Sequence, residues 1–143
     1  MAIKINTEKR IFTLETKHTM YQMQADTYGV LRHLWYGAKT GCDMSYLQDY
    51  PDVGFSGNPH DAGNDRTYSL DTLPLEYAGA GIGDFRVPAV EAVHADGSCA
   101  LDLRYYSHTV KQGKYAICRR CMPERTKRKH WKWFCGIRLL RWK

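Results

Sequence analysis

Apolar and polar residues alternate along two adjacent segments near the start of the chain. In residues 10–16, Phe12 and Leu14 alternate with Thr13 and Glu15, and residues 19–24 show the same spacing. Successive side chains of a β-strand point to opposite faces of a sheet, so this pattern is typical of strands with one buried face. The short polar stretch at 17–18 predicts the turn of a hairpin between the two strands.

Further strand-like segments follow. Residues 30–37 are rich in aromatic and branched side chains, and Trp35 among them is expected to pack in the core because large aromatics are mainly buried. Residues 89–94 and 100–110 flank the sequence ADGS at 95–98, and an Asp-Gly pair between alternating runs is a strong hairpin signal. No segment carries a sustained apolar stripe with helical spacing. The sequence therefore predicts an all-β protein of antiparallel meanders.

A long connection, roughly residues 37–88, separates the third and fourth predicted strands. It is dense in Gly, Pro, Asp and Asn, and such turn chemistry holds a loop in a definite shape, as a binding loop requires. One piece, GAGIGDF at 79–85, has the glycines of a phosphate loop, but Pro88 and a strand-like run follow it instead of a helix, which indicates a turn. Another piece, HDAGNDRTYSLD at 60–71, lacks the ligand spacing of a calcium loop.

Charge divides the chain at residue 118. Residues 118–143 hold ten Lys and Arg against one acid, a net charge of +9, whereas residues 1–117 hold eleven against fourteen acids, a net charge of −3. The overall +6 therefore reflects the tail alone. The tail also carries a ligand spacing that suits zinc, with tryptophans among its basic residues, so a zinc-dependent nucleic-acid-binding module is one alternative function. The candidate ligands are Cys118, Cys121, His130 and Cys135.

Several observations bear on the compartment. Lys4, Glu8, Lys9 and Arg10 interrupt the N-terminal stretch, so we expect no secretory signal peptide. No run approaches the roughly 18 apolar residues of a membrane span. The two cysteines of the first 117 residues lie far apart, which suits a reducing compartment. We therefore expect a cytoplasmic protein with no membrane partner, no metal and no cofactor.

Four stretches of the chain carry a more specific signal: IFTLETKHTMYQMQADTYGVLRHLWYG, FSGNPHDAGNDRTYSLDTLPLEY, GDFRVPAVEAVHADGS and LDLRYYSHTVKQGKY. Together they resemble the N-terminal region of bacterial α-galactosidases of glycoside hydrolase family 36. The resemblance runs from about residue 3 to residue 117, and DRTYSLDTLPLEY is its most specific block. It implies that residues 1–117 are the opening portion of the family's N-terminal domain, a partial antiparallel β-sandwich.

The resemblance also implies an activity for the intact family enzyme. Such an enzyme is a retaining α-galactosidase, which removes terminal α-linked galactose from galactosides such as melibiose and raffinose. The reaction uses two carboxylates about 5–5.5 Å apart. In the family both are aspartates of a downstream (β/α)8 barrel, and no residue of this chain matches either motif, so we expect no catalytic residue and no activity from the chain alone. A stand-alone carbohydrate-binding β domain is the second alternative function.

A role for the long connection follows from the same resemblance. In the family's tetramers this loop reaches from one subunit towards the active-site pocket of its neighbour. The matching positions, which we predict to contact the α-galactoside substrate, are Asp52, Phe55, Asn58, Asp65 and Arg66. Asp52 and Arg66 are the strongest candidates, and Phe55 would offer an apolar face to the sugar. From the residues alone, Asp65 and Arg66 fit an internal brace of the loop equally well, because most charged pairs are structural or solvated.

The family pattern ends abruptly at Cys118. Suitable codons for the tail, read one base earlier, encode LPAVYAGTDKAETL, which resembles the sequence that the family has next. We therefore interpret residues 118–143 as an aberrant basic tail produced by out-of-frame translation. Such a tail should be disordered, should bind polyanions only weakly and without specificity for a nucleic acid, and should leave an edge of the sandwich exposed.

Overall fold

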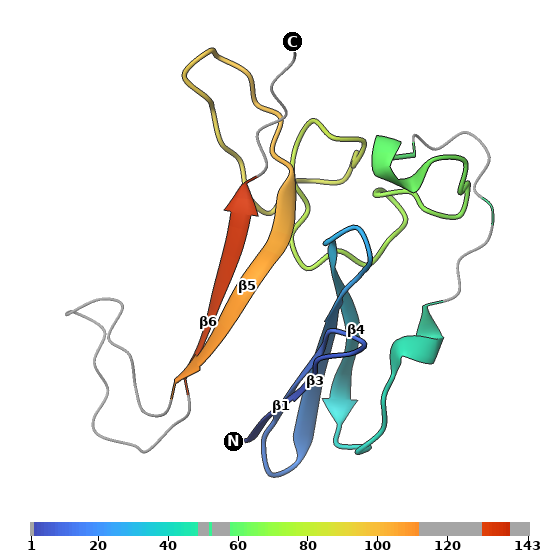
Figure 1. Ribbon diagram of the computed structural model, residues 1–143, viewed down its shortest axis with the longest axis vertical. Helices are drawn as coiled ribbons and strands as arrows, with labels where there is room; N and C mark the ends of the chain where they lie inside the picture. The colour runs from blue at the N-terminus through green and yellow to red at the C-terminus, as the bar shows by residue number, and fades with distance from the viewer. Residues whose placement is uncertain (1, 49–51, 53–57, 112–129, 138–143) are drawn as a thin grey trace.

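The structure is a computed structural model that describes residues 2–48, 52, 58–111 and 130–137. These residues contain six strands and two short 3₁₀-helices: β1 (Ala2–Asn6), β2 (Ile11–Glu15), β3 (Thr19–Ala25), β4 (Leu31–Ala38), η1 (Ser45–Leu47), η2 (His60–Ala62), β5 (Leu103–Lys111) and β6 (His130–Ile137). Strands β1 to β4 form one antiparallel sheet in chain order, and β5 and β6 form a second. Figure 1 shows the β5–β6 pair beside the four-stranded sheet.

The β2–β3 hairpin confirms the alternation read from the sequence. Phe12 pairs with Met23 and Leu14 pairs with Tyr21, so these apolar side chains share one face of the sheet. The predicted turn is closed by Thr16, whose hydroxyl accepts hydrogen bonds from the backbone N–H groups of His18 (3.3 Å) and Thr19 (2.9 Å). The pattern of period two thus fixes both the strands and the register between them.

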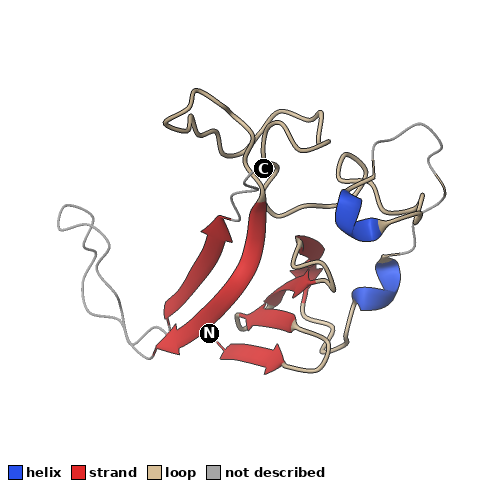
Figure 2. Cartoon of the chain, turned by 45° about the horizontal axis from the view of Figure 1, so that its top comes forward, coloured by secondary structure: helices blue, strands red, loops and turns tan. Residues whose placement is uncertain are grey.

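The β5–β6 pair lies against the four-stranded sheet (Figure 2), and aromatic rings make contact between the two sheets. The ring of Phe12, which is 1% exposed, lies 5.6 Å from the ring of Tyr105 and 5.0 Å from that of His108. The backbone N–H of Tyr105 donates to the carbonyl of Gly29 at 2.7 Å, which ties β5 to the end of the first sheet. The described residues therefore form an all-β, partial antiparallel sandwich, as the sequence predicted.

The opposite face of the four-stranded sheet is covered by the segment around η1. Gln22 holds this segment in place: its side-chain oxygen accepts from the Met44 N–H at 2.9 Å, and its amide nitrogen donates to the Cys42 carbonyl at 3.1 Å. Beneath it lies a cluster of buried residues, Ile11, Met20, Leu34 and Met44. Trp35 packs against this cluster while partly exposed, in agreement with the core position expected for it.

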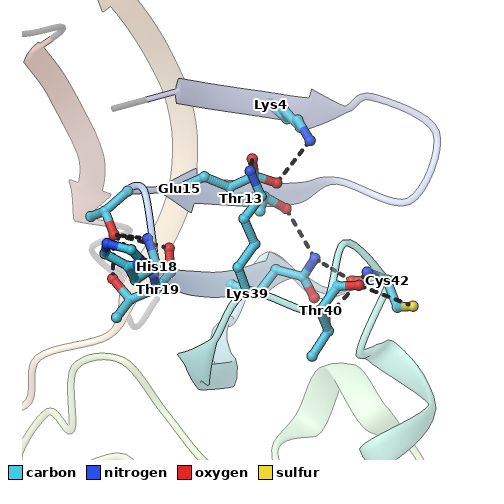
Figure 3. Close-up of polar contacts among 10 residues, drawn as sticks. Lys4, Thr13, Glu15, His18, Thr19, Lys39, Thr40 and Cys42 are labelled. Carbon is cyan, nitrogen blue, oxygen red and sulfur yellow. Dashed lines mark hydrogen bonds and ion pairs between the residues drawn. The ribbon is translucent and has the colours of Figure 1, made fainter.

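A buried carboxylate lies on the same face (Figure 3). Glu15 is 3% exposed, and its two oxygens are each 2.8 Å from a lysine nitrogen, Lys4 on β1 and Lys39 beyond β4. The hydrogen bond from Lys39, followed by that from Lys4, lowers the pKa of Glu15 below its ordinary value. The carboxylate is therefore ionised near neutral pH. Through Lys4 and Lys39 it links β1 to the end of β4, at the two edges of the sheet.

The structure corrects two of the predicted elements. Strand β1 was not predicted, although Ile3 and Ile5 alternate with polar neighbours and pair with Leu14 and Phe12. Residues 89–94 do not form the predicted strand: beyond one isolated bridge at Val90 they have no ladder partner. A strand pattern needs a neighbouring strand to bond with, and none of the described residues supplies one there.

The turn that follows is present as expected. The His94 N–H donates to the Ser98 carbonyl at 2.9 Å, and Gly97 takes a φ of 83°, a conformation that suits glycine. The ADGS signal therefore predicted the turn correctly, but the residues that flank it do not pair as a hairpin.

The tail differs from expectation over one stretch. Residues 130–137 form β6, which pairs antiparallel with β5 and interrupts the register once, between Tyr105 and Ser107. The expectation of a disordered tail is therefore wrong for this stretch, where β6 covers one edge of β5. An unpaired strand edge readily accepts another strand, and the aromatic and branched residues of HWKWFCGI favour the extended conformation.

The part of the chain that the structure describes contains no α-helix. Within it, no helix has the length and apolar character needed to cross a membrane.

Candidate functional site

The predicted substrate-binding residues lie on or next to residues 58–73, which we name the anchored loop. Buried contacts hold this loop to the sandwich, whereas its charged residues face solvent. The deepest contact is between Tyr68, 6% exposed, and Asp26, 4% exposed, which follows β3. The Tyr68 hydroxyl donates to Oδ2 of Asp26, and Oδ1 of Asp26 accepts from the N–H groups of Tyr28 (2.9 Å) and Val30 (2.8 Å). One carboxylate thus joins the loop to the turn between β3 and β4.

Electrostatics keep the Tyr68 hydroxyl in its donating form. Burial, followed by the hydrogen bond to the Asp26 carboxylate, raises the pKa of Tyr68 above its ordinary value. Arg32 completes the group, with its Nε 3.5 Å from Oδ2 of Asp26. A buried carboxylate with both oxygens satisfied in this way is a stable attachment point, because leaving a buried charge unpaired is costly.

A second anchor is Arg86, which reaches the far end of the anchored loop from outside it. Its Nη1 donates to the Leu73 carbonyl at 2.8 Å and its Nη2 donates to the Leu70 carbonyl at 2.6 Å. The buried carboxylate of Asp84 orients the guanidinium by accepting from Nε at 2.9 Å and from Nη2 at 3.0 Å. Burial raises the pKa of Asp84, but the hydrogen bonds from Arg86 outweigh it and hold that pKa below its usual range.

A third anchor lies near η2. Arg104 of β5 donates from Nη1 to the Tyr28 carbonyl at 3.0 Å, and its Nη2 is 3.7 Å from a carboxylate oxygen of Asp61. The anchored loop is therefore attached to the turn after β3, to β5 and to the segment at 84–86. Loops with several buried attachment points keep one shape, which is the property a binding loop needs.

On the solvent side, the structure brings Asp52 and Arg66 together. The Nε of Arg66 lies 3.2 Å from Oδ1 of Asp52, with the Arg66 side chain 61% exposed and the Asp52 side chain 53% exposed. Arg66 thus pairs with Asp52 and not with its sequence neighbour Asp65. An ion pair this exposed contributes little to stability, and its charged groups remain accessible to a ligand.

Asn58 and Asp65 meet in a separate, local arrangement. The side-chain amide of Asn58 donates to the backbone carbonyl of Asp65. The Asp65 carboxylate accepts from the N–H of Thr67 at 3.0 Å and from its hydroxyl at 2.6 Å, and the hydroxyl contact comes first among the causes that lower the pKa of Asp65. These contacts shape the turn from which Arg66 projects. Phe55, the remaining predicted residue, lies outside the described residues.

The glycine-rich segment has a packing role. An added Cβ at Gly79 would lie 2.3 Å from the Leu101 carbonyl oxygen, and one at Gly81, whose φ is 81°, would lie 2.9 Å from Ala100. The glycines therefore allow the backbone to approach the segment that leads into β5, in agreement with the turn interpretation.

Metal ligands were predicted only as an alternative, in the tail. In the described residues, no group of three or more His, Cys, Asp or Glu side chains is placed to hold a metal ion. Of the proposed ligands, Cys118 and Cys121 lie outside the described residues, while His130 and Cys135 fall within β6. The zinc alternative therefore stays untested.

Two antiparallel sheets that face each other, with a long anchored loop beside them, define a β-sandwich domain. The sequence profile of the glycosyl hydrolase family 36 N-terminal domain matches residues 29–126, past the point at residue 117 where the resemblance was expected to end. The chain belongs to this family, and the described residues within that match form part of the β-sandwich of its N-terminal domain.

Relatives agree with this assignment. The chain is 51% identical over 117 residues to the bifunctional α-galactosidase/sucrose kinase AgaSK of Mediterraneibacter gnavus, covering 82% of this chain and 12% of the relative. It is 40% identical over 114 residues to an α-galactosidase of Lactobacillus acidophilus, covering 78% of this chain and 15% of the relative. The chain thus spans only about an eighth to a sixth of the length of the curated relatives that it matches.

Solved structures show the same fold. The galactosidase domain of AgaSK superposes with a TM-score of 0.79 at 51% identity, covering 81% of this chain and 16% of that one. The α-galactosidase AgaB of Geobacillus stearothermophilus superposes with a TM-score of 0.70 at 39% identity, covering 80% of this chain and 15% of that one. Structures of a further Geobacillus stearothermophilus α-galactosidase, AgaA, contain raffinose or stachyose.

Proposed function

We propose that this chain is the N-terminal β-sandwich portion of an α-galactosidase and that it acts only together with the catalytic part. The identity of 51% over 117 residues to an α-galactosidase/sucrose kinase carries the proposal. Hydrolysis of terminal α-galactosyl residues would need the paired carboxylates of a retaining glycosidase, about 5–5.5 Å apart. Those carboxylates would come from the large part of the relatives that this chain does not span.

The sandwich would support assembly of a tetramer and complete the active site of a neighbouring subunit. Asp52 and Arg66 would lie at the edge of that pocket, since their exposed ion pair projects from a loop whose base is buried. A guanidinium donates several hydrogen bonds in a fixed plane, which suits the hydroxyl groups of a galactoside. Asn58 and Asp65 would shape the turn, and Phe55 would contact the apolar face of the sugar.

We further propose that residues 118–143 arise from out-of-frame translation and that the intact protein is cytoplasmic. Sequencing the DNA across the codons for Lys114 to Met122 tests the first point. A single-base insertion or deletion there restores the family pattern in the shifted frame, and an unbroken reading frame shared by independent isolates contradicts the proposal.

The site is tested in a chimeric enzyme, in which the matched 117-residue segment of this chain replaces its counterpart in the Mediterraneibacter gnavus relative. We expect Arg66→Ala to lower kcat/KM roughly ten- to a hundredfold, because a hydrogen bond to a charged group contributes about 1.5–3 kcal/mol. Lys9→Ala is the matched control: it also removes an exposed ion pair, with Asp43 at 2.7 Å, but one outside the anchored loop. The control should leave kcat/KM unchanged.

Two outcomes count against the proposal. If Arg66→Ala and Lys9→Ala give the same kcat/KM as the parent chimera, Arg66 has no role at the sugar. If the parent chimera assembles, as judged by size-exclusion chromatography, yet hydrolyses no α-galactoside, this segment does not serve an α-galactosidase.

A further inference from the structure

Phe85 and Val87 are the most exposed of the large hydrophobic residues that the structure describes. Phe85 is 83% exposed and Val87 is 91% exposed, and they flank Arg86, the second anchor of the anchored loop. Single exposed apolar residues are ordinary on a protein surface, but two that are held side by side on a fixed backbone mark a contact surface.

Arg86 holds the backbone turn between these two exposed side chains. The Arg86 side chain turns inwards to the carbonyls of Leu70 and Leu73 and to the buried carboxylate of Asp84. The backbone N–H of Arg86 also donates to Oδ1 of Asp84 at 3.1 Å, which closes a local turn. The central residue is thus held through both its backbone and its side chain, and its two neighbours lie exposed on either side of it.

This rigidity favours binding. Association costs free energy whenever mobile side chains and loops must be ordered, and a surface that is already ordered avoids much of that cost. Contacts of Asp84 and Arg86 hold the backbone between the two apolar residues without any partner. A solvent-exposed loop that binds no partner would be expected to carry polar residues at these positions.

We propose that Phe85 and Val87 dock this domain onto the larger, downstream part of the family polypeptide. The relatives supply the argument for this occupant: they match this chain over 12–16% of their length, so most of each relative has no counterpart here and is available to cover the exposed pair. The inference rests on the proposed role of the chain as the N-terminal part of a larger enzyme. In this proposal the Asp84–Arg86 pair has a second role, which is to position the docking surface.

Hydroxyl-radical footprinting tests the proposal, because it reports the solvent exposure of individual side chains. The 143-residue chain and the chimeric enzyme are labelled in parallel, and oxidation of Phe85 is measured by mass spectrometry. We expect Phe85 to be oxidised about tenfold less in the chimera, since the core of a protein interface is fully buried. Equal oxidation of Phe85 in the two proteins overturns the proposal. Protection that rises with the concentration of the 143-residue chain also overturns it, because the occupant is then a second copy.

Variants supply the second arm. The double variant Phe85→Ser and Val87→Ser should leave the Tm of the 143-residue chain unchanged, because both side chains are exposed in it, and should lower the Tm of the chimera. Val93→Ser is the matched control, at a residue 75% exposed but outside the segment that Arg86 fixes. It should leave both Tm values unchanged. An unchanged Tm of the double variant in a chimera that hydrolyses α-galactosides refutes the docking surface while leaving the proposed function intact.

Discussion

Replacing Tyr68 by Phe removes one hydroxyl group from the deepest attachment of the anchored loop. The ring can stay where it is, packed edge-on against the ring of Tyr28 at 4.7 Å, so little packing is lost. What disappears is the donor to Oδ2 of Asp26, a carboxylate that is 4% exposed. After the substitution, Oδ2 of Asp26 still has the Arg32 Nε nearby, but at 3.5 Å this nitrogen is beyond ordinary hydrogen-bond length.

The expected loss follows from this geometry. A hydrogen bond to a charged group contributes about 1.5–3 kcal/mol, and an unsatisfied buried acceptor retains its desolvation penalty. The free energy of unfolding should therefore fall by about 1.5–3 kcal/mol, a large fraction of the stability of an ordinary domain. Because burial and the Asp26 carboxylate raise the pKa of Tyr68, the hydroxyl is a donor throughout the neutral range and the loss should not depend on pH there.

Urea unfolding followed by circular dichroism measures this loss. The midpoint should shift down by about 1 M with no change in slope, since the surface exposed on unfolding is nearly the same. Tyr46→Phe is the matched control, because Tyr46 is 70% exposed and removal of its hydroxyl should change stability by less than about 0.5 kcal/mol. If Tyr68→Phe costs no more than Tyr46→Phe, the contact with Asp26 does not hold the loop and the reasoning is wrong.

Two further predictions concern acid stability and activity. The pKa of Asp84 lies below that of an unfolded aspartate, about 3.9, so the stability that its ionisation contributes is fully present above that value and is lost as pH falls through the folded pKa. Asp84→Asn should therefore flatten the decline of Tm with pH in this acid range, and an unchanged profile would contradict the pairing with Arg86. The 143-residue chain should release no galactose from a chromogenic α-galactoside, because under the proposed function the paired carboxylates come from the part of the enzyme that this chain does not span; measurable turnover would contradict that proposal.

Local pattern was enough to predict most of the strands. The alternation in β2 and β3, the aromatic run of β4 and the apolar run of β5 each survive in the structure, because each has a neighbouring strand to bond with. The same kind of pattern failed at 89–94, where that neighbour is missing among the described residues. Strand formation depends on a partner elsewhere in the chain, and a local pattern carries no information about that partner.

The site was predictable only in part, for a related reason. Its proposed solvent-facing members, Asp52 and Arg66, were predicted through the family resemblance, and the structure adds that they pair. The buried contacts that position them were missed. Asp26 and Tyr68 are separated by 42 positions, and neither residue type is unusual in its own segment.

Arg86 is the most instructive case, since its sequence context, GDFRVP, reads as an exposed turn. An arginine in a loop is ordinarily solvated, and only the carbonyls of Leu70 and Leu73 show that this one is turned inwards. Its neighbours Phe85 and Val87 face solvent, against the usual preference of apolar side chains. One guanidinium therefore contacts both the loop that carries substrate-binding candidates and the turn proposed for docking. A substitution of Arg86 should disturb both at once, whereas a substitution of Arg66 or of Phe85 should disturb only one.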